Sequence, residues 1–213
     1  MRVLSVCEYL IEGDRHPDHV TPYQIVRAVK GLPFDGHATI TVGGVQQRID
    51  SSNREPAVAW AVERLGARIF AEHEREAITI VPVPGHTHAM PEEVAAGRMH
   101  HLGSALAEAL RARGVSAHVF PLLCWRAAIQ SVREGGSRDP AVLVPQLWVA
   151  PAQHVRKVAL IDDVVTSGGH IAAACAVLSA AGHDVADVAF TVGRTVKRKE
   201  TCSGSSSRSA RGR

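Results

Sequence analysis

The segment from Asp162 to His170 combines two adjacent acids with a glycine-containing polar loop. It follows the apolar run 158–161, which has the pattern of a buried strand, and it precedes an apolar segment of helical character from Ile171. Glycines allow backbone N–H groups to converge closely, and a following helix adds the positive end of its dipole. Such a loop favours a phosphate dianion. The two carboxylates can accept hydrogen bonds from the vicinal hydroxyls of a ribose whose phosphate lies in the loop.

Simpler interpretations of the same residues exist. Two acids after a strand can cap a helix or face solvent, and Gly168-Gly169 can be only a turn. The coincidence, in order, of a strand, an acid pair, Thr-Ser-Gly-Gly and a helix favours the ligand site. Other phosphate motifs fit poorly, because the sequence has neither G-x-x-x-x-G-K-[ST] nor G-x-G-x-x-G after a strand. A P-loop NTPase and a Rossmann dehydrogenase are therefore disfavoured.

The elements that must position this loop appear as short apolar runs that alternate with helical segments. The apolar runs cover residues 78–83, 116–123 and 157–161, and helical spacing covers 99–113 and 171–181. This alternation predicts an α/β fold with a parallel twisted sheet flanked by helices. Sites in such sheets lie at the carboxyl ends of the strands, which is where the acid pair falls.

The chain divides by composition into three predicted parts. Residues 1–76 are expected to form a small N-terminal subdomain of strands and turns followed by one helix, either hood-like or packed on the core. Its strand 38–42 ends at a Gly43-Gly44 turn, and its helix spans 56–70. Residues 77–194 form the predicted core. Residues 195–213, rich in Ser, Gly and Arg, are expected to be a disordered basic tail.

Composition limits the classes of function. A net charge of +3 over 213 residues argues only weakly for nucleic acid. No apolar run is long enough to span a bilayer, so no membrane partner is expected. The four cysteines are Cys7, Cys124, Cys175 and Cys202. Their spacing in the sequence suggests neither a disulfide framework nor a cysteine zinc site. We therefore expect reduced thiols in a soluble cytoplasmic protein.

Four histidines lie near one another in the sequence: His86, His88, His100 and His101. They can be considered as metal ligands, but their spacing matches no established zinc site and no cysteine accompanies them. We expect them to line the loop after residue 84 or to face solvent.

Residues 158–169 resemble the phosphoribosyl pyrophosphate (PRPP) motif of type I phosphoribosyltransferases, which has a strand, two acids, two apolar residues and Thr-Thr/Ser-Gly. The resemblance implies that Asp162 and Asp163 bind the ribose hydroxyls, with Mg²⁺ arriving through PRPP nearby. It also implies a cradle for the 5-phosphate, made by Thr166, Ser167, Gly168, Gly169 and His170. The sequence departs from the family at His170, where threonine is usual, so one hydroxyl donor is lost.

A fainter resemblance extends over residues 78–194, to the competence-protein-F-like branch of this family. Val81-Pro82-Val83-Pro84 is similar to the Pro-Val-Pro segment whose loop holds pyrophosphate, which implies roles for Pro84, Gly85 and Arg98. A later stretch matches the branch at Arg126, Gln130 and Arg138. The sequence lacks the branch's N-terminal cysteine zinc finger, and residues 97–101 replace its Arg-Gly-Phe-Asn-Gln signature.

Two segments named by this resemblance have alternatives. Arg98 can be a solvent-facing arginine at a helix start, since most arginines are exposed. The arginine-rich segment 125–140, which contains Gly135-Gly136, can be a lid that closes over a substrate or an ordinary surface loop.

The function expected from these features is that of a glycosyltransferase of nucleotide metabolism, which transfers phosphoribosyl from PRPP to a nitrogenous base that the sequence does not identify. The alternative is a non-catalytic protein that senses PRPP or a nucleotide on the same fold, or recruits a partner. A third and weaker hypothesis is association with nucleic acid through the basic tail. The family resemblance also implies a homodimer as a possible assembly.

Overall fold

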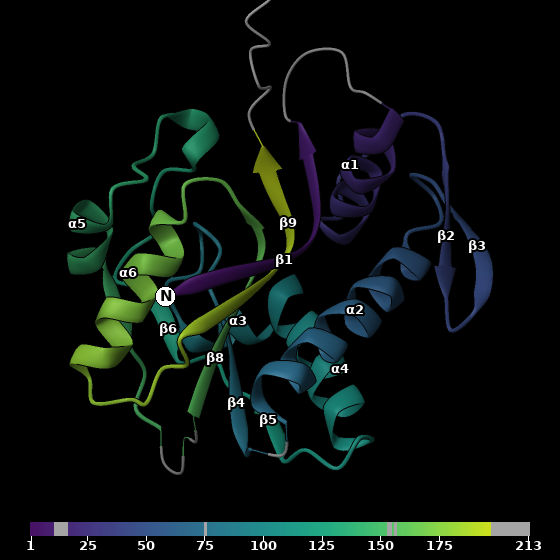
Figure 1. The fold of residues 1–213 in the computed structure, drawn as a ribbon. Helices are drawn as coiled ribbons and strands as arrows, with labels where there is room; N and C mark the ends of the chain where they lie inside the picture. Colours follow the sequence, from purple (N-terminus) through teal and green to yellow (C-terminus); the bar gives the residue numbers. More distant parts are fainter. Residues whose placement is uncertain (11–16, 75, 153–154, 156, 197–213) are drawn as a thin grey trace, which may run out of the picture.

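A five-stranded parallel sheet forms the centre of the computed structural model, which describes residues 1–10, 17–74, 76–152, 155 and 157–196 (Figure 1). Every neighbouring pair of its strands is parallel. In spatial order the strands are β1 (Arg2–Leu10), β9 (Val188–Val196), β8 (Lys157–Val165), β4 (Ile78–Pro82) and β5 (Ala117–Val119). All five residues of β4 are buried, as expected for a strand covered on both faces. The predicted α/β fold with a parallel sheet is confirmed.

Helices cover both faces of the sheet (Figure 1). One face carries α1 (Pro17–Val29), α2 (Glu55–His73) and α4 (Arg98–Arg111). The other carries α6 (Gly169–Ala180) and the short α5 (Pro140–Leu143). The helix α3 (Pro91–Ala95) leads into α4, and 3₁₀ turns lie at Val132–Glu134 and Val144–Gln146. Two antiparallel pairs complete the described elements: β2 (Ala38–Val42) with β3 (Val45–Ile49), and β6 (Leu123–Trp125) with β7 (Leu147–Val149).

The N-terminal part differs from the expected strands and turns followed by one helix. The hairpin is present, and Gly43 and Gly44 both have positive φ, as a tight two-residue turn requires. However, α1 precedes it as a second helix, so the expectation of a single helix was wrong. Pro17 begins this helix, where proline is tolerated, and Pro22 lies inside it. Because β1 pairs with β9, the first strand belongs to the main sheet, and the boundary at residue 76 stays a prediction.

Two further boundaries of structural elements differ from those predicted from the sequence. The apolar run 116–123 forms β5 and then the start of β6, which belongs to a different sheet, with Pro121 between them. At the other end, Thr195 and Val196 lie within β9 rather than in a tail. The remainder of the predicted disordered tail, residues 197–213, lies outside the described residues.

Strand β8 extends further than the sequence indicated, and this extension carries the acid pair. Its apolar part, residues 158–161, was predicted as the whole strand, but β8 continues to Val165 because it stays paired with β9 up to Arg194. Its other neighbour, β4, ends at Pro82, with one more hydrogen bond from Val83 N–H to the Ile161 carbonyl oxygen. The acids are therefore inside the strand, on the part of β8 that has passed the end of β4.

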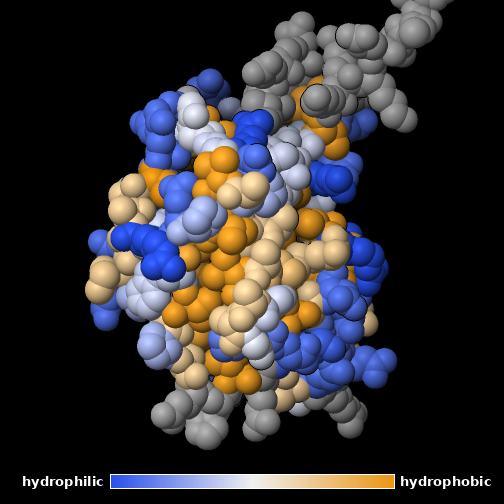
Figure 2. Space-filling view, turned by 90° about the vertical axis from the view of Figure 1, so that its left-hand side faces the viewer, coloured by the Kyte–Doolittle hydropathy of each residue, from blue (hydrophilic) through white to orange (hydrophobic). Residues whose placement is uncertain are grey.

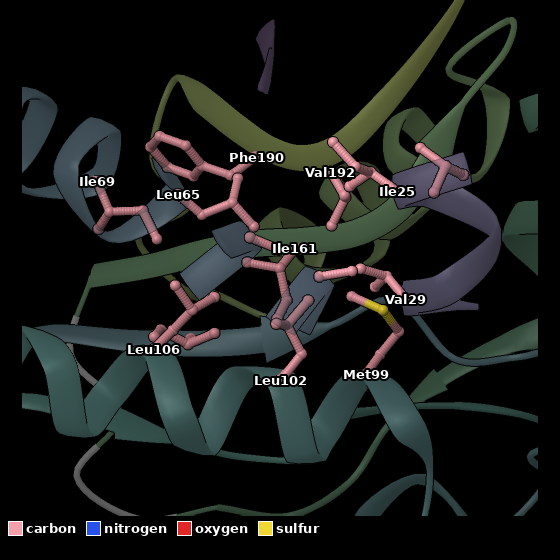
Figure 3. Close-up of a cluster of buried hydrophobic side chains, with 14 of the residues drawn as sticks. Ile25, Val29, Leu65, Ile69, Met99, Leu102, Leu106, Ile161, Phe190 and Val192 are labelled. Carbon is pink, nitrogen blue, oxygen red and sulfur yellow. The ribbon is translucent and has the colours of Figure 1, made fainter. Parts of the chain in front are cut away.

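The main hydrophobic core lies between the sheet and the three helices of one face (Figure 3). Leu65 and Ile69 from α2 and Leu102 and Leu106 from α4 are each no more than 2 % exposed. They pack toward residues of β8 and β9, including Phe190. These positions recur every three to four residues, the period that brings helix side chains to one face.

The opposite face of the sheet is covered by α6. Helix α6 is apolar on nearly every side, and its inner residues Ile171, Ala174 and Leu178 are buried against the sheet, as the predicted core helix required. The helix ends before Gly182, whose φ of 85° is the left-handed geometry expected after a helix. Figure 2, which views this side directly, shows apolar side chains gathered at the centre of the face. Among the residues the structure describes, no helix is both long and apolar enough to cross a membrane.

The core between the sheet and α4 is tested by truncating Leu106, which is fully buried. We expect Leu106→Ala to lower the free energy of unfolding by about 2 to 5 kcal/mol, because it removes buried methylenes and leaves a cavity. The matched control is Val142→Ala, at a side chain that is 45 % exposed, which should change stability by less than about 0.5 kcal/mol. Urea unfolding followed by circular dichroism measures both, and equal effects of the two would contradict the assigned core.

Candidate functional site

Asp163 lies at the centre of a charge cluster built from three elements. Its Oδ1 accepts a hydrogen bond from Lys30 Nζ at 2.9 Å, and its Oδ2 accepts one from Arg98 Nη2 at 2.5 Å. Arg98 Nη1 also donates to the Lys30 carbonyl oxygen at 3.0 Å. The Asp163 side chain is only 12 % exposed, so these two cations offset the cost of burying an ionised carboxylate. Both carboxylate oxygens are thus engaged by the protein itself.

Apolar packing next to each charged residue fixes this cluster. Val29 precedes Lys30 at the end of α1, Met99 follows Arg98 at the start of α4, and Ile161 lies two residues before Asp163 on β8. All three apolar side chains are buried in the same core, and Figure 3 shows them close together. The core therefore brings the ends of α1 and α4 to the carboxyl end of β8.

Asp162, the other acid, has a different environment. Its Oδ1 accepts a hydrogen bond from the Asp163 backbone N–H at 2.7 Å. Burial, together with the negative charge of Asp163, raises the pKa of Asp162 from 3.8 to about 8. The two adjacent acids therefore differ in environment: Asp163 is paired with cations, whereas Asp162 holds a proton more readily than an ordinary carboxyl group.

The loop after β8 leads directly into α6. Thr166 and Ser167 are exposed, and Gly168, with a φ of 81°, occupies the position before the first helical residue. That left-handed conformation favours glycine. The exposed Thr and Ser, followed by the N-terminal N–H groups of α6, form the arrangement that suits a phosphate group.

Gly169 has a second reason to lack a side chain. A Cβ atom at this position would collide with the carbonyl oxygen of Arg138. The segment 126–140 therefore runs across the start of α6, and the predicted site residue Arg138 lies beside the loop through its backbone. Its side chain is exposed. The charge of Arg138, after burial, also lowers the pKa of His170, so the imidazole favours its neutral form.

The loop after β4 is held by the segment that follows β6. Pro84 is buried, and Gly85 is partly exposed. The Gly85 carbonyl oxygen accepts a hydrogen bond from Trp125 Nε1 at 2.9 Å, and the His88 carbonyl oxygen accepts one from the Trp125 backbone N–H at 3.0 Å. The His88 ring is turned back into the loop, where its Nδ1 lies 3.1 Å from Gly85 N. Burial lowers the pKa of His88.

The remaining predicted residues lie in the segment from Trp125 to Pro140. Arg126 is exposed, and its Nε donates to the Pro145 carbonyl oxygen at 3.1 Å. Gln130 donates its side-chain amide to the Glu134 carbonyl oxygen within a turn. This ordered turn contains Gly135, with a φ of 99°, and the 3₁₀ turn at Val132–Glu134.

The histidines considered as metal ligands do not converge. His86 is on the loop after β4, and His100 and His101 are on the first turns of α4. No group of three or more His, Cys, Asp or Glu side chains that could hold a metal ion occurs among the described residues.

The structure brings together the acid pair, the glycine loop and Arg98, which the sequence indicated. The backbone of Arg138 also lies beside the loop, although the sequence had indicated this residue for its charge. The structure also adds Lys30 and Trp125, which sequence reasoning did not assign to the site. An apolar groove of about 680 Å³ lies elsewhere, between β2, α2 and α4, and none of its lining residues belongs to the loop; they include Val42, Val58, Val62, Ala105 and Ala109.

Comparison with solved structures finds a likeness to an orotate phosphoribosyltransferase from Aeropyrum pernix. The two sequences are 17 % identical, the match covers 80 % of this chain and 81 % of that chain, and the TM-score is 0.40. No protein-family model matches the sequence, and no curated protein matches it. The resemblance to the competence-protein-F-like branch stays a prediction.

The raised pKa of Asp162 predicts a pH-dependent stability. Between the unfolded pKa near 3.8 and the folded pKa of about 8, the native state binds more protons than the unfolded state, so stability falls as pH rises through this window. Asp162→Asn imitates the protonated form. We expect its melting temperature to match that of the unaltered protein near pH 4 and to exceed it by at least about 2 °C near pH 9. Parallel pH profiles of the two proteins, recorded by differential scanning calorimetry, would contradict the assigned environment.

The Lys30–Asp163 pair predicts a loss of stability that salt does not remove. Lys30→Ala leaves the buried carboxylate with Arg98 alone, and we expect the free energy of unfolding to fall by about 1 to 2 kcal/mol. The control is Arg48→Ala, which breaks an exposed pair with Asp50 and should lower the stability much less, because water and salt screen this pair. Urea unfolding at low and high salt distinguishes them: a Lys30→Ala effect that disappears at high salt would show that the pair is only a surface interaction.

Proposed function

We propose that this chain is a phosphoribosyltransferase-like protein that binds PRPP with Mg²⁺ and transfers its phosphoribosyl group to a nitrogenous base. One observation carries the proposal: the acid pair, the start of α6 and two cations meet at the carboxyl end of β8. The acids suit ribose hydroxyls, the helix start suits a phosphate, and the cations suit a second anionic group. A ligand with a ribose between two phosphate groups is complementary to all three.

Binding such a ligand requires an exchange of partners at Asp163. Its two oxygens are occupied by Lys30 and Arg98, so ribose hydroxyls can reach them only if the cations move. The cations released in this way then bind the pyrophosphate group. The exchange keeps every charge paired, because the carboxylate gains hydroxyl donors while the cations gain phosphate oxygens.

The transfer itself needs mainly electrostatic stabilisation. As pyrophosphate leaves C1 of the ribose, positive charge develops on the sugar ring and negative charge develops on the leaving group. In this proposal Lys30 and Arg98 stabilise the leaving group, and the carboxylates contact the sugar. Holding the reactants in alignment supplies a further part of the rate enhancement.

The residues present fit Mg²⁺ in one specific way. Mg²⁺ prefers oxygen ligands and is commonly held by one or two carboxylates together with substrate phosphates and water, rather than by a cage of protein groups. Asp162 and Asp163 provide the carboxylates, and no protein cage was found among the described residues. When bound with pyrophosphate, Mg²⁺ would neutralise charge on the leaving group.

A non-catalytic sensor on the same fold is the second candidate, and one observation favours it. His170 stands where the resembled family has a threonine, so the side chain at this position provides no hydroxyl for the phosphate. Its ring packs against Trp125 instead, with ring centroids 5.9 Å apart. A weaker cradle is compatible with reversible sensing of PRPP or a nucleotide. Fold alone does not distinguish a sensor from an enzyme.

Turnover with Mg²⁺ and PRPP separates the two candidates. Pyrophosphate release is measured against a panel of purine, pyrimidine and pyridine bases, and thermal stabilisation by PRPP is measured in parallel. Release with any base supports the enzyme, and stabilisation without release supports the sensor. Asp163→Asn should weaken PRPP binding by about tenfold or more, because hydrogen bonds to a charged acceptor are lost. An Asp163→Asn protein that binds PRPP normally would refute the site.

The segment 126–140 is proposed as the cover of the bound ligand, and its arginines provide the test. We expect Arg126→Ala and Arg138→Ala each to raise the KM for PRPP by about tenfold or more, the effect of one charge-assisted hydrogen bond. Arg68→Ala, an exposed arginine on α2, is the control and should change nothing. If both substitutions leave turnover and PRPP affinity unchanged, the cover is an ordinary surface loop.

A further inference from the structure

Trp125 is completely buried and contacts both loops of the proposed site. From β6, its indole N–H donates to the Gly85 carbonyl oxygen in the loop after β4. The edge-to-face contact of its ring with His170, at an interplanar angle of 88°, reaches the loop after β8. These two loops are separated by about eighty residues in the sequence, and this single side chain lies between them.

The hydrogen bonds from Trp125 and Ile129 set the direction in which the peptide groups of the loop after β4 point. Three of its carbonyl oxygens, those of Gly85, His86 and His88, accept hydrogen bonds from Trp125 or Ile129. In a trans peptide the C=O and N–H groups point in opposite directions. A Gly85 carbonyl that points toward Trp125 therefore turns the His86 N–H away from it.

The outward N–H groups of this loop have no protein acceptor. Those of His86 and Thr87 donate to no group in the described part of the chain, and both residues are exposed. Successive free N–H groups in a turn form a concavity that favours an anion. The orientation of this concavity depends on the carbonyl groups of Gly85 and His86, which are fixed by hydrogen bonds from Trp125 and Ile129.

We propose that Trp125 is a positioning residue that orients both anion-binding loops, through its N–H for the loop after β4 and through its ring for the loop after β8. The inference rests on the proposed function, because it assigns pyrophosphate to the first loop and the 5-phosphate to the second. It goes further by separating the two tasks between two parts of one side chain. Trp125 itself touches neither phosphate.

This division of tasks makes different predictions for two substitutions of Trp125. Trp125→Phe keeps an aromatic ring beside His170 but removes the N–H, so it should weaken binding of inorganic pyrophosphate with Mg²⁺ by about fivefold, the effect of one hydrogen bond. Its affinity for ribose 5-phosphate should stay within about twofold of that of the unaltered protein. Trp125→Leu removes both the N–H and the ring, and it should weaken the binding of both ligands. Trp148→Phe, at a half-buried tryptophan on β7, is the matched control.

Isothermal titration with each ligand separately gives both affinities for every protein. Selective loss of pyrophosphate affinity in Trp125→Phe supports the inference, and unchanged or equal losses for the two ligands overturn it. If Trp125→Phe does not fold by circular dichroism, His170→Ala and His170→Phe test the ring contact. His170→Ala should weaken ribose 5-phosphate binding and His170→Phe should leave it within about twofold of that of the unaltered protein, and equal weakening by both overturns the inference. An unaltered protein that binds neither ligand refutes the proposed function as well, whereas normal binding with an unaffected Trp125→Phe refutes this inference alone.

Discussion

The neutralisation of Asp163 is the constraint on which the site depends. A carboxylate this well covered stays ionised only if cations accompany it, and the chain supplies one from the end of α1 and one from the start of α4. The apolar neighbours of all three charged residues belong to one core. Packing and charge therefore specify the same arrangement: shifting either helix along the sheet would separate a cation from the carboxylate and expose buried side chains at once.

The sequence indicated the fold wherever a periodic pattern was local. Strand β4, strand β8 and helices α2, α4 and α6 were found because each has a run of apolar residues at its own period. Helix α1 was missed, although Ile25, Val26 and Val29 have helical spacing. The pairing of β1 with β9 could not be predicted from the sequence, since no local pattern specifies which distant strand becomes a neighbour.

The same division between local and distant information applies to the site. The acid pair and the glycine loop are contiguous, so their chemistry was visible as a motif. Lys30 was not, because a single lysine at a helix end resembles any solvated lysine, and its partner lies more than a hundred residues away. Trp125 fell within a segment interpreted as a lid. Its buried indole N–H needed an acceptor, which was the one available signal, but the sequence does not identify that acceptor as Gly85.

The parallel pairing of β1 with β9 also bears on how the chain reaches its native state. Arg2 lies beside Val188, so the edge of the sheet closes only after nearly all the described residues have been synthesised. Contacts of such long sequence separation carry a large loop-closure entropy and slow folding. Strand β9 is also the bridge between β1 and β8. During synthesis the apolar side chains of β1 therefore stay unpaired until β9 has been made, and this strand is exposed to aggregation for that time.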